Sequence, residues 1–417
     1  MKKRKGLYVI FSGILILTIL LGAFIGLRSK SKKDTQELSK KEMVEDFNYL
    51  FNCIVDNYPY LGVNERVNGV NFKENKDKYL DMINNCENYS EFELAIRNIT
   101  KDLNNSHTYI LDKETVKQFR NLYTSIEGGT WYELNRKVLN NEKAIKRYGL
   151  TKEVEKVEKK DNKLYAEPKV KDIVSGEIGY IELSLMNNKT YREQDMKYIS
   201  DYLDKVKNYK ALVIDIRGNR GGDSTYWRDI FSNIISHNYY TDYYYFHKDG
   251  DLINDFLEYV EVDIESIPKV KDLKDELINL PPEVYKDFKS YWKSEYSVIK
   301  SNRSINFQGN IYLLVDDKVF SSAEALAVFA KDTKMATLIG SRTKGDGIGS
   351  DPMMTMLPNS GLIFNFTKEM GTLKDGTCNE EHKTVPDIVV ENTEKTNDFK
   401  TDECIKKVLE LEQLKIN

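Results

Sequence analysis

The stretch VFSSAEALAVFAKD, residues 319–332, follows an apolar run, NIYLLVDD, at residues 310–317. The apolar run has the length of a strand, and small apolar residues then recur at helical spacing, at Ala323, Leu326, Ala327 and Ala330. The pattern predicts a strand, a turn and a helix that begins beside Ser321. A serine at such a junction lies near unpaired backbone N–H groups and the positive end of the helix dipole, which both favour developing negative charge. Ser321 is therefore a candidate nucleophile for acyl transfer.

The same residues also fit a structural role. Ser321 and Glu324 match the S-x-x-E capping box, in which the serine only satisfies the first turn of the helix. Caps of this kind open many helices, so this segment by itself favours the structural role. Other parts of the chain have to decide between the two.

Composition narrows the classes of function. The 417 residues carry 62 basic and 66 acidic side chains, so no overall positive charge indicates a nucleic-acid partner. The four cysteines lie far apart and form no C-x-x-C pair, which argues against a structural zinc site and a disulfide framework, and we expect neither metal nor cofactor. Any site that needs an imidazole must use one of four histidines: His107, His237, His247 and His382.

The N-terminus has the pattern of a membrane anchor. Residues 1–5 are mostly basic, residues 6–27 form an uncharged apolar run, and a charged linker covers residues 28–38. At about 1.5 Å of rise per residue, this run matches a hydrocarbon layer of roughly 30 Å. We expect a retained transmembrane signal anchor with a short cytosolic tail, and a body on the extracytoplasmic side of the cell membrane.

The remaining chain divides into a helical N-terminal region at 39–111, a connecting insertion at 112–174 and an α/β core at 175–395. Ser39 and Ser90 are the expected caps of the first two long helices. The core begins with strands alternating with helices and contains an insertion at about 228–309; a C-terminal helix is expected within 396–417. The expected core strands include 211–216, 311–315, 335–339, 361–366 and 388–390.

The insertion opens with an aromatic run, HNYYTDYYYFH, at residues 237–247. We interpret these tyrosines as core and sheet surface. The alternative is a lid or substrate groove, since aromatic side chains also line clefts that bind peptides.

A glycine-rich loop, RGNRGG at residues 217–222, follows the buried strand ALVIDI. It matches neither common phosphate-binding motif, so a nucleotide is not expected. Glycines at a strand end can bring a free N–H close to a substrate oxygen. The backbone of Gly221 or Gly222, together with the amide of Ser322, is therefore predicted to form an oxyanion hole beside Ser321.

Five motifs in a fixed order resemble the tail-specific, or C-terminal processing, serine peptidases and their tricorn-core relatives. They are SHT at 106–108, VIDIRGNRGG at 213–222, FSSAE at 320–324, LIGSRTKGDG at 338–347 and DGTCNEEHKTVPDIVV at 375–390. The resemblance implies a crotonase-like (ClpP/crotonase) α/β core.

The superfamily contains two catalytic arrangements. One branch uses a Ser–Lys dyad, but the slot of its lysine holds Asp346 here, and Lys344 lies two residues earlier. The tricorn-like branch implies that Ser321 is the nucleophile and His107 the base, with Ser106 and Glu380 orienting the imidazole. Glu381 is a rival for the role of Glu380, and His382 for the role of base.

The sequence thus predicts a membrane-anchored extracytoplasmic serine endopeptidase that acts on peptides or proteins. The alternative is a catalytically inactive protein of the same fold that binds peptides or other ligands. Arg220 stands where the resemblance implies a further glycine, and no PDZ domain follows His107 to select a free C-terminus. The oligomeric state is left open.

Overall fold

The computed structural model describes residues 37–125, 130–153, 165–260, 262, 265–273 and 277–416. The predicted anchor at residues 6–27 lies outside these ranges. Within them, no helix is both long and apolar enough to cross a membrane.

Seven helices form the helical region of the described chain, which extends into the segment predicted as a connecting insertion: α1 (Lys40–Asn57), α2 (Leu61–Asn68), α3 (Lys76–Asn84), α4 (Tyr89–Lys101), α5 (Lys113–Ser125), α6 (Thr130–Leu139) and α7 (Glu142–Arg147). The cap of α1 is confirmed, since Ser39 and Glu42 form a capping box. The expected cap of α4 is wrong. This helix begins one residue earlier than Ser90, because the side chain of Asn88 accepts a hydrogen bond from the Glu91 N–H.

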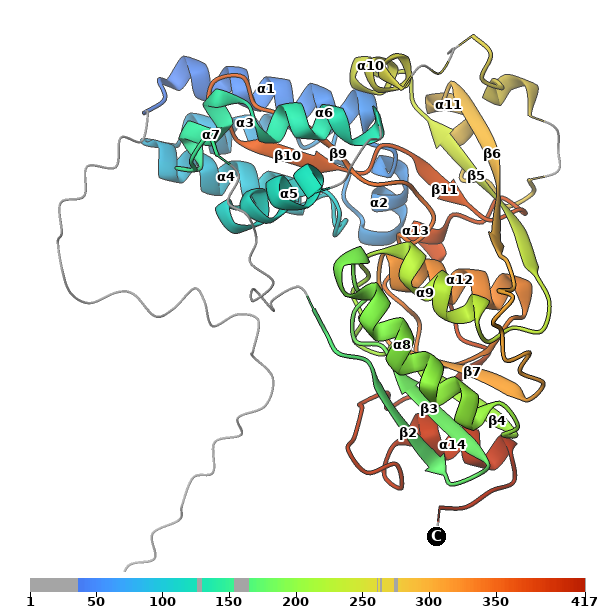
Figure 1. Ribbon diagram of the computed structural model, residues 1–417. Helices are drawn as coiled ribbons and strands as arrows, with labels where there is room; N and C mark the ends of the chain where they lie inside the picture. The colour runs from blue at the N-terminus through green and yellow to red at the C-terminus, as the bar shows by residue number, and fades with distance from the viewer. Residues whose placement is uncertain are drawn as a thin grey trace, which may run out of the picture. The chain divides into compact units, whose positions relative to one another are not determined.

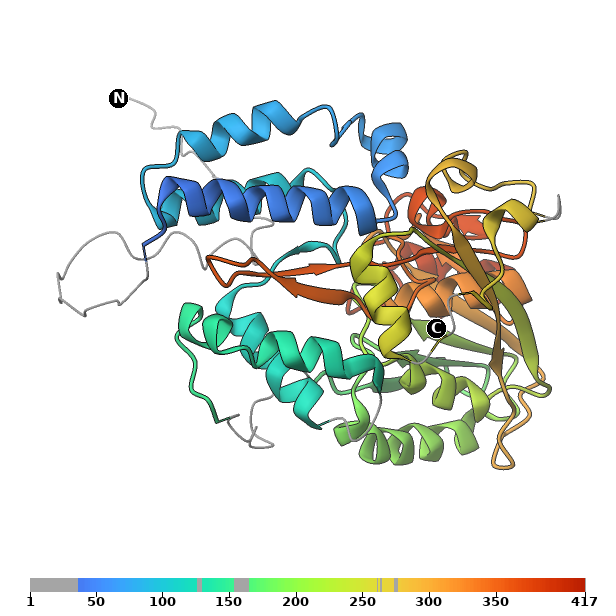
Figure 2. The same cartoon turned by 90° about the horizontal axis from the view of Figure 1, so that it is seen from above.

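A small antiparallel sheet fills the interior of this helical region. Its order is β1 (Tyr109–Ile110), β10 (Ile363–Phe366) and β9 (Met353–Met356). Figure 2 shows the orange β9–β10 hairpin between the blue helix α1 and the teal helices. The expectation that 361–366 belongs to the α/β sheet is therefore wrong: Phe364 pairs with Ile110, far away in sequence.

The α/β core is a six-stranded sheet in the order β12-β8-β7-β4-β3-β2. All neighbouring strands are parallel except β2 at the edge, which is antiparallel to β3. The strands are β2 (Lys169–Val174), β3 (Ile178–Glu182), β4 (Ala211–Asp215), β7 (Asn310–Val315), β8 (Thr337–Gly340) and β12 (Ile388–Val389). The prediction of a buried parallel strand in ALVIDI is confirmed, because every residue of β4 is buried between parallel neighbours.

Helices cover both faces of this sheet (Figure 1). Leu212 and Ile214 of β4 pack with α8 (Lys189–Val206), α9 (Ser224–Ser232) and α12 (Ser322–Thr333). Ala211 and Val213 face the other side, where α14 (Glu403–Leu411) covers them. Alternate side chains of one strand thus enter two different cores, as expected for a fully buried strand.

The segment predicted as an insertion supplies most of a third sheet, in the order β11 (Met370–Thr372), β5 (Tyr239–His247) and β6 (Ser290–Val298). The tyrosine run is strand β5, which pairs along its whole length with β6. The connection between them carries α10 (Asp251–Tyr259), the short 3-10 helix η2 (Val270–Asp272) and α11 (Val284–Asp287). A last helix, α13 (Asn379–His382), precedes β12.

Candidate active site

Three adjacent parallel strands, β4, β7 and β8, each end in a loop on the same edge of the sheet. The carboxyl ends of parallel strands are the usual place for a site in such folds. The loop after β7 is tied to both of its neighbours: Phe320 N donates to Asn219 O at 3.3 Å, and Lys344 N donates to Val319 O at 2.8 Å. These two hydrogen bonds hold Ser321 between the glycine loop and the turn after β8.

Ser321 has an unusual backbone conformation. Its φ of 57° and ψ of −127° lie in a region that residues with a side chain rarely adopt, and such strain tends to gather at functional sites. Its hydroxyl makes no capping hydrogen bond to α12 and lies instead 3.0 Å from Nε2 of His107. The carboxylate of Glu324 accepts from Asn379 and Thr384 rather than from the helix start. The capping-box interpretation is therefore wrong.

His107 is held in place through its backbone. Its N–H donates to Oδ1 of Asn105 at 3.0 Å, and its carbonyl accepts from Nδ2 of Asn365 in β10 at 2.6 Å. Its ring lies against Phe320, with 4.4 Å between the ring centroids. The hairpin in the helical region thus positions the imidazole over the α/β core.

The other ring nitrogen of His107, Nδ1, lies 2.7 Å from Oδ2 of Asp346. Asp346 sits in the turn after β8 with a φ of 54°, and its side chain is almost fully buried. Oγ of Ser321, the imidazole and a carboxylate therefore form one connected chain of the kind found in serine hydrolases. From the sequence, Asp346 is notable only because it stands at the position of the lysine of the Ser–Lys dyad, and no role is predicted for it.

The two residues expected to orient the imidazole have other surroundings. Ser106 is exposed, and among the described residues its hydroxyl makes no hydrogen bond to His107. Glu380 is buried beside the site, and its Oε1 accepts from Nδ2 of Asn105 at 3.1 Å. The same Nδ2 donates to Oδ2 of Asp346 at 2.9 Å, so Asn105 links the two carboxylates.

Charge interactions follow from this geometry. Burial lowers the pKa of His107, but the Asp346 carboxylate outweighs burial and holds that pKa above its usual value. Burial raises the pKa of the Asp346 carboxyl, yet the adjacent imidazolium outweighs it and the pKa is lowered. Burial and the nearby Asp346 carboxylate raise the pKa of Glu380 to about 7, although Lys383 pairs with it at 2.8 Å.

The glycine loop lies directly against the nucleophile. A Cβ on Gly221 would lie 2.8 Å from Cβ of Ser321 and 2.9 Å from the backbone N of Ser322, so only glycine fits. The N–H of Gly221 donates to Oδ1 of Asn219. The N–H groups of Gly222 and Ser322 donate to none of the residues that the structure describes. These two amides remain available for an oxyanion.

Two rival residues, Glu381 and Lys344, have other contacts. Glu381 pairs with Arg66 at 2.6 Å. The ammonium of Lys344 lies 5.6 Å over the ring of Phe320, and burial together with Arg220 lowers the pKa of this lysine. In the part of the chain that the structure describes, no group of three or more His, Cys, Asp or Glu side chains is arranged to hold a metal ion.

The fold and this connected serine, histidine and aspartate define a mixed α/β protein with the site of a serine hydrolase. The sequence profile of Peptidase family S41 matches residues 177–390, more than half of the chain. The chain belongs to this family and is a serine-type peptidase with a helical N-terminal region. The match begins beyond His107, so the histidine comes from outside the matched segment.

Solved structures with the same fold have distant sequences. A candidate peptidase from Parabacteroides merdae ATCC 43184 is 17% identical, with a TM-score of 0.57 and coverage of 88% of this chain and 96% of its own. Mature CPAF is 12% identical, with a TM-score of 0.54 and coverage of 84% and 92%. No curated protein matches the chain.

Proposed function

We propose that the protein hydrolyses peptide bonds through an acyl-enzyme on Ser321, with His107 as general base and Asp346 as the carboxylate that orients it. The observation that carries this proposal is the 3.0 Å contact between Oγ of Ser321 and Nε2 of His107, with Asp346 at 2.7 Å from Nδ1. A carboxylate on Nδ1 leaves the lone pair of Nε2 free to accept the hydroxyl proton.

In the first step, Oγ of Ser321 attacks the carbonyl carbon of the substrate while its proton moves to Nε2 of His107. The carbonyl oxygen becomes an oxyanion, which the N–H groups of Gly222 and Ser322 would bind. The tetrahedral intermediate then collapses, the C–N bond breaks, and His107 gives its proton to the leaving amine. Water attacks the resulting ester with His107 again as base, which releases the acid and restores Ser321.

Glu380 and Ser106 remain predicted positioning residues. The contacts of Glu380 support an indirect role, because Asn105 connects its carboxylate to Asp346 and to the backbone of His107. The support for Ser106 is its place in the chain beside His107. The crotonase-like classification of the core also remains part of this proposal, supported by the parallel sheet with helices on both faces.

We place the catalytic body on the extracytoplasmic side of the cell membrane, anchored by residues 6–27. The uncharged length of this run and the basic residues before it support that location.

A fluorophosphonate probe tests the chemistry directly, since it reacts with an activated serine. We expect labelling of the wild type and of Ser322→Ala, which keeps its backbone amide, but not of Ser321→Ala. Labelling that persists in Ser321→Ala would move the nucleophile elsewhere. A folded wild type that no probe labels would favour the inactive binding protein.

A further inference from the structure

A cavity of about 390 Å³ lies beside the candidate active site. Its walls include Ala325 in the first turn of α12, Gly347 next to Asp346, and Ser224 just beyond the glycine loop. The N–H of Ala325 donates to the carbonyl of Ser321 at 2.8 Å. All three segments that form the site thus continue into the wall of this cavity, which has the size of a ligand pocket.

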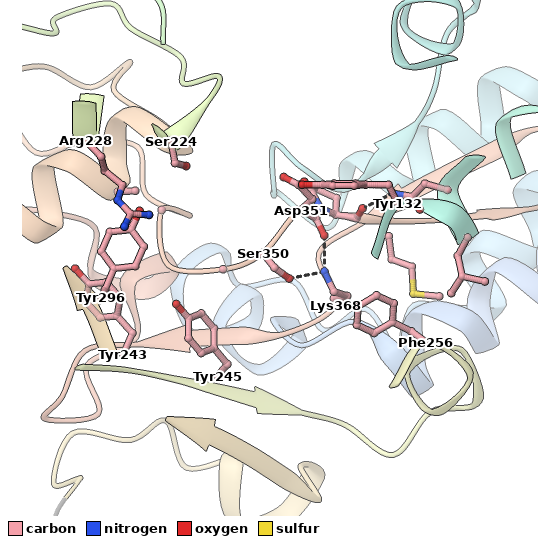
Figure 3. Close-up of a pocket in the computed structure, with 17 residues that line it drawn as sticks. Tyr132, Ser224, Arg228, Tyr243, Tyr245, Phe256, Tyr296, Ser350, Asp351 and Lys368 are labelled. Atoms are coloured by element: carbon pink, nitrogen blue, oxygen red, sulfur yellow. Dashed lines mark hydrogen bonds between the residues drawn. The ribbon is translucent and has the colours of Figure 1, made fainter. Parts of the chain in front are cut away.

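At one end of the cavity, the charged group is the ammonium of Lys368, which has partners within the protein. Nζ of Lys368 donates to Oγ of Ser350 and to the carbonyl of Asp351, and it lies 4.9 Å over the ring of Phe256 (Figure 3). The carboxylates of Glu369 and Asp351 attract this buried ammonium. The carboxylate of Asp351 also helps to raise the pKa of His107.

The other end carries a cation without a counter-charge. The guanidinium of Arg228 in α9 lies 4.9 Å over the ring of Tyr296, with Tyr243 beside them (Figure 3). The two acidic residues of this segment, Asp223 at the cap of α9 and Asp229 within the helix, both pair with Arg192, at 2.6 and 3.3 Å. Among the described residues, no carboxylate lies within ion-pair distance of Arg228.

A second observation points to the same end. Tyr243 lines the cavity and is only 3% exposed, yet its hydroxyl has no hydrogen-bond partner within the described residues. Buried hydroxyls are nearly always paired. A carboxylate in the cavity would supply an acceptor for this hydroxyl as well as the counter-charge for Arg228.

The geometry points to a substrate subsite in this cavity, in which Arg228 binds a carboxylate of the peptide and the aromatic walls hold the adjoining apolar part. The assignment rests on the proposed peptidase function. A planar guanidinium binds a carboxylate through two parallel hydrogen bonds, which fixes the orientation of the chain that carries it. The carboxylate comes either from an acidic side chain or from a free C-terminus, which offer the same chemistry.

The test uses binding, so that it does not depend on turnover. Peptides of alanine and leucine that carry an uncharged dansyl fluorophore on the N-terminus, with one central Glu or Gln and a free or amidated C-terminus, are titrated into Ser321→Ala and followed by anisotropy. We expect peptides with a carboxylate to bind about tenfold or more tightly, as a charged hydrogen-bonded pair in a partly buried site should. If amidation weakens binding, the carboxylate that Arg228 binds is the free C-terminus. If replacing Glu by Gln weakens binding, it is the acidic side chain.

Adding Arg228→Gln to Ser321→Ala should remove the preference, so that all four peptides bind alike, whereas Arg228→Lys should restore part of it. Arg303→Gln, on an exposed loop, is the matched control and should keep the preference. Equal binding of all four peptides to Ser321→Ala would overturn the subsite without any further variant. A preference that survives Arg228→Gln would overturn the role of this arginine. Fluorophosphonate labelling of the wild type reports separately on the proposed catalysis.

Discussion

Oδ2 of Asp346 lies 2.7 Å from Nδ1 of His107, on the side of the imidazole opposite Ser321. This contact joins a turn of the α/β core to a loop of the helical region, 239 residues away in sequence. It also explains why the site needs no lysine at this position. With a carboxylate there, the histidine supplies the base.

The first prediction therefore concerns Asp346→Asn. Asparagine tolerates the positive φ of this turn, so the fold should persist. An amide N–H facing Nδ1 would favour the tautomer that carries its proton on Nε2, where the serine proton must go. By analogy with triads in other serine proteases, kcat/KM on a peptide should fall about 10²- to 10⁴-fold. Asp317→Asn, on the exposed loop before Ser321, is the matched control; an equal loss there would point to a general loop effect.

The second prediction concerns pH. His107 must be neutral to accept a proton, and its pKa is raised by Asp346. Activity should therefore be lost as the pH falls through this raised pKa, so kcat/KM should rise to a plateau with a midpoint above the ordinary histidine value of about 6.5. In Asp346→Asn the midpoint of the residual activity should shift downward. A midpoint that is the same in both proteins would mean that this ionisation belongs to another group.

The third prediction separates Glu380 from its neighbour. Glu380→Gln keeps an acceptor for Asn105 but removes a charge that helps to raise the pKa of His107. We expect a loss in kcat/KM of about tenfold or less, together with a lower pH midpoint, because the residue acts through others. Glu381→Gln is the control, since its carboxylate pairs with Arg66. A larger effect of Glu381→Gln would reverse the two assignments.

The strand, turn and helix around Ser321 could be predicted because each has a local signature in the sequence. The apolar run forms β7, and the segment with small residues at helical spacing forms α12. The pairing of Ser321 with His107 came from the order of the motifs, since no local pattern brings together residues so far apart. In contrast, the same S-x-x-E letters are compatible with a cap, which the hydrogen bonds of Ser321 and Glu324 in the structure exclude.

Asp346 and Asn105 could not be assigned from sequence because their roles depend on long-range contacts. No local feature of the glycine turn indicates that the carboxylate of Asp346 lies beside a ring nitrogen of His107. Likewise, the short strand β10 resembles a core strand in sequence, and one of its two partners, β1, is only two residues long. The tyrosine run was predicted as core and sheet surface; Tyr243 and Tyr245 of β5 also line the cavity, which supports the alternative of a substrate groove.

The fourth prediction concerns location. If residues 6–27 form an anchor, full-length protein should fractionate with membranes, and protease added outside spheroplasts should digest the body. A variant that lacks residues 1–36 keeps every described helix and strand and should be recovered in the soluble fraction. Full-length protein in the soluble cytosolic fraction would contradict the anchor.

The last prediction compares the two possible bases. Lys344 is half-buried and its pKa is lowered, which are features of a lysine base, so a displaced Ser–Lys dyad has to be tested. The geometry favours His107, because its Nε2 is the hydrogen-bond partner of Oγ of Ser321, whereas the Lys344 ammonium lies over Phe320. We expect His107→Ala to reduce kcat/KM by about 10³-fold or more, and Lys344→Ala to change it only a few-fold. Lys344→Met, which keeps the length and packing of the side chain over Phe320, separates loss of charge from loss of contact. If Lys344→Met abolished turnover while His107→Ala retained it, the base would be the lysine, and the raised pKa of His107 would have no part in the pH profile.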